Sequence, residues 1–171
     1  EILLKNLSKQ NFTEAFPIQQ AAIPAIIQKK DVLGIAKTGS GKTASYVLPL
    51  LMNQLEAKIT RSRHINALVL VPTRELAAQV SEVFKLFSQG FSKPIKTRAV
   101  FGGVSINPQM KDLLGVQILV ATPGRLLELM DANAVHISEI DTLVLDEADE
   151  MLNMGFRDEM DRIFAQLPKK R

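Results

Sequence analysis

Hydrophobic residues along this chain form short, often β-branched runs that alternate with longer segments of helical spacing. We expect the runs to be strands: Val32–Ala36, Ala67–Val71, Thr97–Phe101, Gln117–Ala121 and Thr142–Asp146. Runs that are apolar throughout, without polar alternation, are typical of parallel strands covered on both faces.

In the longer segments, apolar residues recur every three or four positions, which predicts helices. These predicted helices are Ile2–Leu7, Ile18–Gln28, Ala44–Glu56, Arg74–Phe87, Asn107–Leu114, Gly124–Ala132 and Ala148–Leu167. Alternation of strand and helix predicts an α/β fold, a parallel sheet with helices on both faces. No repeat or linker divides the 171 residues, so we expect one domain over residues 1–171.

Glycine-rich and polar clusters follow the predicted strands directly. They are Ala36–Thr43, Pro72–Glu75, Gly102–Gly103, Thr122–Arg125 and Asp146–Asp149. Ligands of open parallel sheets bind beyond the carboxyl ends of the strands. The spacing therefore predicts that the functional residues gather at one edge of the sheet.

The first of these clusters reads Ala-Lys-Thr-Gly-Ser-Gly-Lys-Thr, between a predicted strand and a predicted helix. A glycine-rich turn at a helix start points backbone N–H groups at a phosphate, and the helix adds partial positive charge. Lys42 would lie beside the outer phosphates, and the Thr43 hydroxyl would ligate Mg²⁺. An ordinary Gly/Ser loop is the alternative, which the flanking elements and the Gly-Lys-Thr triplet disfavour.

The last apolar run ends in Asp146 and Glu147. A carboxylate in this position can reach a phosphate-bound Mg²⁺, directly or through water, which is the role expected for Asp146. Glu147 can orient or deprotonate the water that attacks the terminal phosphate. The pair could instead be acids of a first helical turn. With the phosphate loop upstream, we interpret Lys42, Asp146 and Glu147 as catalytic.

Residues Asp146–Asp149 spell Asp-Glu-Ala-Asp, and the chain resembles the DEAD-box ATP-dependent RNA helicases. The sequence around the motifs is most similar to that of bacterial members. Six elements occur in the family's order. They are a Q motif at Phe12–Gln19, motif I at Ala36–Thr43, motif Ia at Pro72–Ala77, the Gly102–Gly103 turn, motif Ib at Thr122–Arg125, and Asp146–Asp149 itself. In the Q motif, Ala15 and Phe16 stand where Pro and Thr are usual.

The resemblance implies a RecA-like P-loop domain that binds ATP and Mg²⁺. It implies that Gln19 hydrogen-bonds adenine and that Phe12 stacks on it, whereas the residues alone suggest an exposed polar side chain and a core aromatic. The other implied ATP-binding residues are Ala36, Lys37, Thr38, Gly39, Ser40, Gly41, Lys42 and Thr43. Thr43 and Asp146 are the implied Mg²⁺ ligands, partly through water.

The resemblance also implies contacts with RNA, through Pro72, Thr73, Arg74, Gly102, Gly103, Thr122, Pro123, Gly124 and Arg125. Glycines let a phosphate approach the backbone, and Thr and Arg supply donors, so such contacts tolerate any base sequence. The alternatives are that Pro123 and Gly124 only begin a helix, and that Arg74 and Arg125 are solvated helix residues.

A second RecA-like domain is implied as a partner, with Asp149 directed toward it or toward the family's Ser-Ala-Thr motif. Neither is found in residues 1–171. We therefore expect a piece of a longer protein, nearly inactive as an ATPase alone. We also expect an unfilled slot between Val32–Ala36 and Thr142–Asp146, where the strand leading to the missing motif would insert.

Composition adds several exclusions. The absence of cysteine excludes disulfides and thiolate metal sites, and with no segment resembling a signal peptide it predicts a cytoplasmic protein. The apolar runs are too short to span a bilayer, so no membrane partner is expected. A net charge of 21 − 18 = +3 permits a polyanionic partner without requiring one.

The expected function is ATP hydrolysis coupled to unwinding or remodelling of RNA duplexes by the full protein. Two alternatives stay open. One is a different P-loop ATPase such as a DNA translocase, and the other is an ATP-gated clamp that holds RNA and seldom unwinds it.

Overall fold

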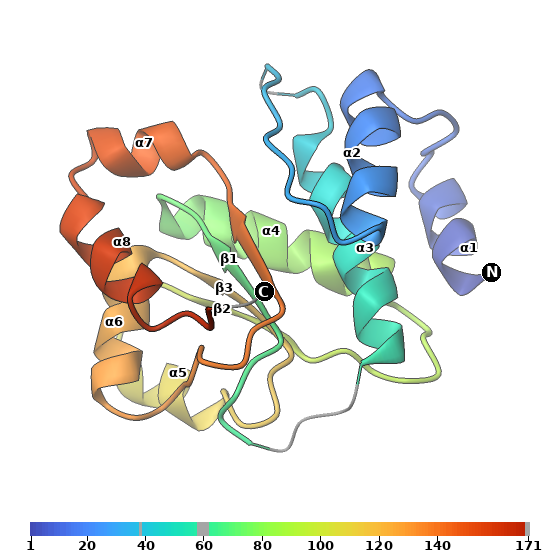
Figure 1. The fold of residues 1–171 in the computed structure, drawn as a ribbon. Helices are drawn as coiled ribbons and strands as arrows, with labels where there is room; N and C mark the ends of the chain where they lie inside the picture. The colour runs from blue at the N-terminus through green and yellow to red at the C-terminus, as the bar shows by residue number, and fades with distance from the viewer. Residues whose placement is uncertain (38, 58–61, 170–171) are drawn as a thin grey trace. The chain divides into compact units, whose positions relative to one another are not determined.

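The computed structural model describes residues 1–37, 39–57 and 62–169, which belong to two compact units. The helical unit comprises Glu1–Ala57 and Glu82–Ile95, and the sheet unit comprises Lys58–Ser81 and Lys96–Arg171. Figure 1 traces the chain through both.

The sheet unit is built on four parallel strands in the order β2-β3-β1-β4. In chain order, they are β1 (Ala67–Leu70), β2 (Thr97–Val100), β3 (Ile118–Ala121) and β4 (Thr142–Leu145). Leu70 is paired with both Ala121 and Leu145, and Val100 is paired with Ala121, so the four strands end level with one another. The α/β class and the parallel sheet are confirmed.

Four helices of the sheet unit pack onto one face of the sheet (Figure 1), namely α5 (Ile106–Lys111), α6 (Pro123–Asp131), α7 (Ala148–Asn153) and α8 (Arg157–Phe164). Their apolar residues form one core with every second strand residue, such as Leu68 and Leu119. Val69 and Val120, which point to the opposite face, are also fully buried. Burial on both faces explains why the strands are apolar throughout.

The helical unit contains α1 (Ile2–Lys9), α2 (Pro17–Ile27), α3 (Lys42–Glu56) and the second half of α4 (Arg74–Phe87). Helices α2 and α3 pack against each other. Asn6 fastens α1, because its buried amide donates hydrogen bonds to the carbonyls of Phe87 (2.9 Å) and Gln89 (2.8 Å). Every helix in the described ranges is too short or too polar to cross a membrane.

A lysine caps the carboxyl end of α3. The Lys93 ammonium donates to the carbonyls of Gln54 (3.3 Å), Leu55 (3.2 Å) and Ala57. The last carbonyls of a helix lack intrahelical partners and carry partial negative charge, so a cation stabilises them.

The predicted strand Val32–Ala36 is wrong. This segment belongs to no helix or sheet in the described part of the chain, and Leu33 and Ile35 are 88% and 86% exposed. A strand requires a neighbouring strand for its backbone hydrogen bonds, which a hydrophobic run does not guarantee. The slot was predicted between Val32–Ala36 of the helical unit and Thr142–Asp146 of the sheet unit, and it stays a prediction.

The single helix predicted over Ala148–Leu167 is also wrong, because α7 and α8 are separate. Gly155 has a φ of 86°, and its N–H donates to the Leu152 carbonyl while the Phe156 N–H donates to that of Met151. This pattern is the Schellman motif, which ends a helix on a left-handed residue and favours glycine. The other predicted helices are confirmed, α4 with its bounds unchanged and the rest within a few residues.

Candidate functional site

The candidate phosphate loop leads directly into α3. Gly39 and Gly41 have φ values of 80° and 85°, and Gly41 is the N-cap of the helix. The Ser45 N–H donates to the Gly41 carbonyl (3.2 Å), so the N–H groups of the first helical turn before it have no acceptor within the helix. Together with the helix dipole, these groups favour an anion at this end of α3.

The surroundings of the loop fit a chain of phosphates. A Cβ at Gly39 would meet nothing within 4 Å, and the buried Ser40 hydroxyl has no hydrogen-bond partner among the described residues. Lys42 and Thr43 follow in the first turn of α3, both partly exposed. Thr38 lies outside the described residues.

Gln19 connects α2 to this loop. Its side chain is buried, its Oε1 accepts from the Phe16 N–H (3.0 Å), and its Nε2 donates to the Gly41 carbonyl (3.1 Å). The alternative interpretation of Gln19 as an exposed polar residue is therefore wrong. A side-chain amide offers two donors and two acceptor positions, so one of each remains for a further partner. The adenine contact stays a prediction.

Gly41 is where Gln19 and Phe16 meet the loop. A Cβ at Gly41 would lie 2.4 Å from Gln19 Nε2 and 2.7 Å from Phe16 Cδ2, so a side chain at position 41 would require the Gln19 amide and the Phe16 ring to move. The sequence marked Phe16 only as a departure from the family's Q motif. Its direct packing on the loop has no signal in the sequence.

The ring of Phe12 packs edge to face against that of Phe87, with centroids 5.4 Å apart and planes at 85°. The interpretation of Phe12 as a core aromatic therefore accounts for one side of the ring. Stacking on adenine stays a prediction.

The predicted catalytic carboxylates follow β4. The Asp146 N–H donates to the Leu70 carbonyl (3.0 Å) and so extends the pairing of β4 with β1 by one step. Glu147 is exposed and left-handed, with φ 54° and ψ 49°, and it is the N-cap of α7. Asp149 is exposed in the first turn of that helix.

No group of three or more His, Cys, Asp or Glu side chains within the described ranges could hold a metal. Mg²⁺ needs no such cage, because it keeps waters and binds one or two protein oxygens together with phosphates. Thr43 and Asp146 are oxygen donors of that kind. Thr43 belongs to the helical unit and Asp146 to the sheet unit.

The predicted RNA contacts gather at the carboxyl edge of the sheet unit. The Val71 N–H donates to the Ala121 carbonyl (3.0 Å) and the Thr122 N–H donates to the Val100 carbonyl (3.1 Å), so pairing continues into the loops. A Cβ at Gly103 would lie 3.7 Å from Arg74 Nη1. The Arg74 guanidinium therefore lies beside the Gly102–Gly103 turn.

The residues that begin α4 and α6 cap these helices, and one of them, Gly124, borders open space. Thr73 Oγ1 accepts from the Leu76 N–H (3.2 Å), and Thr122 is the buried N-cap of α6, followed by Pro123 at the first helical position. A Cβ at Gly124 would meet nothing within 4 Å. The helix-start interpretation of Pro123 is thus confirmed, and the open space at Gly124 is compatible with a phosphate.

Arg74 pairs with its neighbour, since its Nε donates to Glu75 Oε1 at 2.7 Å. This hydrogen bond holds the pKa of the Glu75 carboxyl below its ordinary value and raises the pKa of Arg74. Both side chains are exposed, so water and salt screen the pair. The guanidinium keeps its charge at the edge of the sheet.

Arg125 differs sharply from Arg74. It is 6% exposed, and its Nη2 and Nε donate to the Val104 carbonyl and to Glu128 Oε2, both at 2.8 Å. Its Nη1 is buried without a hydrogen-bond partner in the described residues. The interpretation of Arg125 as a solvated helix residue is therefore wrong.

Comparison with known proteins bears on the whole chain. Residues 16–171 match the DEAD/DEAH box helicase family. The "DEAD-box ATP-dependent RNA helicase CshA" of Streptococcus pneumoniae serotype 4 is 49% identical over 99% of this chain and 31% of the relative. The "ATP-dependent RNA helicase DeaD" of Buchnera aphidicola is 45% identical over 98% of this chain and 27% of the relative.

The "ATP-dependent RNA helicase CshA" of Listeria monocytogenes is 42% identical over 100% of this chain and 32% of the relative. The chain thus spans less than a third of the length of these three relatives. Together, the motif order, the phosphate loop and the family match lead to one conclusion: the chain belongs to the DEAD/DEAH box helicase family.

Proposed function

We propose that this chain is the ATP- and RNA-binding domain of an ATP-dependent RNA helicase, in which ATP hydrolysis drives unwinding or remodelling of RNA duplexes. The names of the relatives support this activity, since each is called an ATP-dependent RNA helicase. The proposal includes a second RecA-like domain toward which Asp149 is directed, and a cytoplasmic location.

The phosphate loop is the observation that carries the proposal. Its backbone is left-handed at Gly39 and Gly41, it opens the 15-residue helix α3, and the Gln19 amide binds its Gly41 carbonyl. A residue expected to bind the base is thereby hydrogen-bonded to the loop expected to bind the phosphates. We infer that adenine recognition and phosphate binding are structurally coupled through Gly41.

In this proposal, the N–H groups at the start of α3 and the Lys42 ammonium bind the outer phosphates. Thr43 and Asp146 would hold Mg²⁺, which would supply neutralisation of charge on the phosphate oxygens when bound. Glu147 orients a water for attack on the terminal phosphate and accepts its proton. The arginines that complete the site belong to the second domain, so we expect the 171 residues alone to hydrolyse ATP negligibly.

The carboxyl edge of the sheet unit binds the RNA backbone in the same proposal. Arg74 offers a guanidinium beside Gly103, and Gly124 leaves room for a phosphate oxygen. Contacts of this kind do not read bases, so binding should tolerate sequence and weaken with salt.

The decisive experiment separates two residues of the full-length protein. Lys42→Ala should abolish ATP binding and ATPase activity, because it removes the cation expected at the outer phosphates. Glu147→Gln should keep ATP binding, measured with a fluorescent ATP analogue, and lower the ATPase rate about a hundredfold or more. Lys30→Ala, which removes an exposed lysine of the helical unit, is the matched control.

If Glu147→Gln lost ATP binding as completely as Lys42→Ala, the assigned roles would be wrong. Stimulation of the ATPase by single-stranded DNA as strongly as by RNA would favour a DNA translocase. Slow RNA release that depends on bound ATP, without unwinding, would favour a clamp.

A further inference from the structure

The Gly102–Gly103 turn is held at both ends by side chains from two helices. At its start, Gln109 of α5 accepts from the Phe101 N–H and donates to the Phe101 carbonyl, both at 3.2 Å. At its end, Arg125 of α6 donates to the Val104 carbonyl at 2.8 Å. The three backbone groups of Phe101 and Val104 that flank the turn are thereby fixed.

The position of Gln109 follows from the sheet. β2 is an edge strand that pairs only with β3 in the described sheet. The Val100 carbonyl accepts from Thr122 of the β3 side, and successive strand residues point their backbone groups in opposite directions. The Phe101 groups therefore face the open edge, where the Gln109 amide pairs with both of them as a neighbouring strand would.

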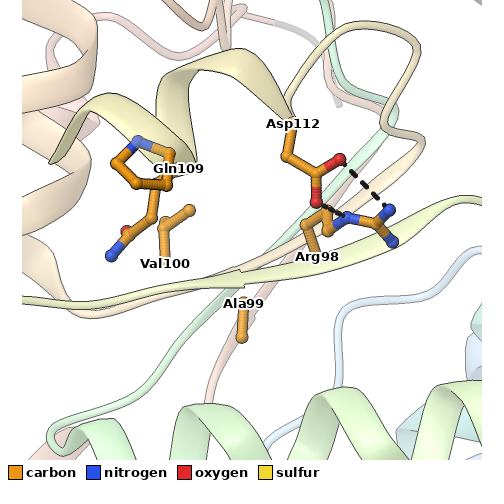
Figure 2. A pocket seen from close by; sticks show the side chains of 6 residues that line it. Arg98, Ala99, Val100, Gln109 and Asp112 are labelled. Carbon is orange, nitrogen blue, oxygen red and sulfur yellow. Dashed lines mark hydrogen bonds and ion pairs between the residues drawn. The ribbon is translucent and has the colours of Figure 1, made fainter. Parts of the chain in front are cut away.

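Gln109 lines a hollow of about 200 Å³ between β2 and α5. Figure 2 shows the side chains that line it. Arg98 and Asp112 form an ion pair on its far side, and the Arg98 Nη1 also donates to the Thr97 carbonyl at 2.9 Å. Side chains thus cover two of the outward-facing backbone positions of this strand, Thr97 and Phe101. Of the side chains that cover this strand edge, Gln109 is the one that reaches the turn.

Arg125 is held too deeply to be a simple phosphate contact. Its side chain is 6% exposed and is paired with Glu128, whereas that of Arg74 is 61% exposed. A buried guanidinium is costly to desolvate and stays in place only with charged or carbonyl partners. Glu128 and Val104 accept from its Nε and Nη2, and its Nη1 is buried as well, so the guanidinium is enclosed by the protein and not offered to solvent.

We propose that Gln109 and Arg125 are positioning residues for RNA binding, which hold residues 101–104 in the conformation that the RNA backbone meets. Arg74, exposed beside Gly103, makes the direct phosphate contact. This inference rests on the proposed function. Nothing about Gln109 in the sequence singled it out.

The dependence of RNA affinity on salt distinguishes the two roles. Each phosphate neutralised by a protein cation contributes about 0.7 to the slope of log affinity against log salt for a single strand. Arg74→Met should reduce that slope by about 0.7. Arg125→Met should weaken affinity roughly tenfold with the slope unchanged, because its guanidinium is buried and donates to Val104 and Glu128 instead of facing solvent.

The measurement uses the full-length protein and a fluorescein-labelled single-stranded RNA of mixed sequence, by anisotropy at several salt concentrations. Gln109→Glu keeps the acceptor for the Phe101 N–H and loses the donor to its carbonyl, and Gln109→Ala loses both. We expect affinity to fall in that order, by about threefold and about tenfold. Arg162→Met, which removes an exposed cation paired with Asp131, is the control for net charge.

A second readout is the RNA-stimulated ATPase. The RNA concentration for half-maximal rate should rise in the Gln109 and Arg125 variants, while the rate at saturating RNA stays within about twofold of the unmodified protein. If Arg125→Met fails to fold, as judged by circular dichroism, the two Gln109 variants decide the question.

Three outcomes would overturn this inference. One is a slope reduced by Arg125→Met as much as by Arg74→Met. Another is an unchanged RNA affinity of the Gln109→Ala variant, and the third is a loss of ATPase rate that saturating RNA does not restore. If the unmodified protein itself bound no RNA, the proposed function would fail first, and these variants would show no change to compare.

Discussion

In the sheet unit, the segments that carry candidate functional residues leave strands that are paired with their neighbours. In the helical unit, the phosphate loop follows Val32–Ala36, which pairs with no strand in the described residues. The carboxyl edge of the sheet is therefore placed by strand register. The phosphate loop is placed by Gly41, and by the Gln19 amide that binds it.

The difference teaches that two loops expected to carry function can depend on different parts of the fold. A loop that directly follows a paired strand is held by the sheet, whose core contains fully buried residues such as Leu119. A loop placed by one amide and one glycine can be disrupted by a single substitution.

Hydrogen exchange should show the largest difference. In the 171-residue chain, amides of residues 32–36 should exchange on the order of a thousandfold faster than those of residues 68–70 and 118–120, because only the latter lie in paired strands. Exchange followed by mass spectrometry of peptides measures this directly. Equal protection of the two regions would mean that Val32–Ala36 is a paired strand after all.

Gly41→Ala should destabilise the phosphate loop strongly. The new Cβ would overlap the Gln19 amide and the Phe16 ring, and the φ of 85° adds strain. We expect a loss of about 2–4 kcal/mol in the free energy of unfolding and no detectable ATP binding. Urea denaturation and a fluorescent ATP analogue measure the two effects.

Gly39→Ala is the matched control for that variant. Its φ of 80° is similar, but a Cβ there would meet nothing within 4 Å. We expect only the left-handed strain, about 1 kcal/mol. A Gly41→Ala variant no worse than Gly39→Ala would show that the Gln19–Gly41 contact does not place the loop.

Lys93→Met should destabilise the helical unit moderately, by about 1–2 kcal/mol, because three carbonyls at the end of α3 lose their cationic donor. Lys85→Met removes an exposed lysine paired with Glu82, and should cost only about 0.2–0.5 kcal/mol. Urea denaturation of both variants gives the comparison. Equal losses would mean that the cap at α3 contributes no more than a surface ion pair.

The smallest effect should come from Glu75. Its folded-state pKa is lowered by the Arg74 hydrogen bond, so the stability it contributes is present above the ordinary carboxyl pKa and is lost as pH falls through the lowered value. In the Glu75→Gln variant, the free energy of unfolding should therefore fall slightly less as the pH is lowered through the acidic range. Denaturation at a series of acidic pH values measures this. Because the pair is exposed, high salt should remove the difference.

Much of the fold could be predicted from sequence, because local periodicity determines it. The spacing of apolar residues gave the bounds of α4 correctly, and the β1 to β4 runs were recognised from their continuous hydrophobicity. The same pattern failed at Val32–Ala36, since pairing depends on a neighbour that no local pattern reports. It failed again at Gly155, where the preference of glycine for a left-handed backbone ends the helix although the apolar spacing continues.

The candidate site was predictable where chemistry and spacing coincide, as in Gly41, Lys42 and Asp146. It was less predictable where burial decides the role. Arg125 was predicted as a phosphate contact and is enclosed by Val104 and Glu128. Gln109 resembles any polar helix residue until the open edge of β2 gives it a partner.

The left-handed backbone of Glu147 has a consequence for directed evolution. At φ 54° a glutamate is strained by about 1 kcal/mol relative to glycine, and asparagine tolerates this region better than most residues. A library of the full-length protein selected only for thermal stability should therefore accumulate glycine or asparagine at position 147. Selection for ATP turnover should restore glutamate, so the two selections would separate stability from activity at one residue.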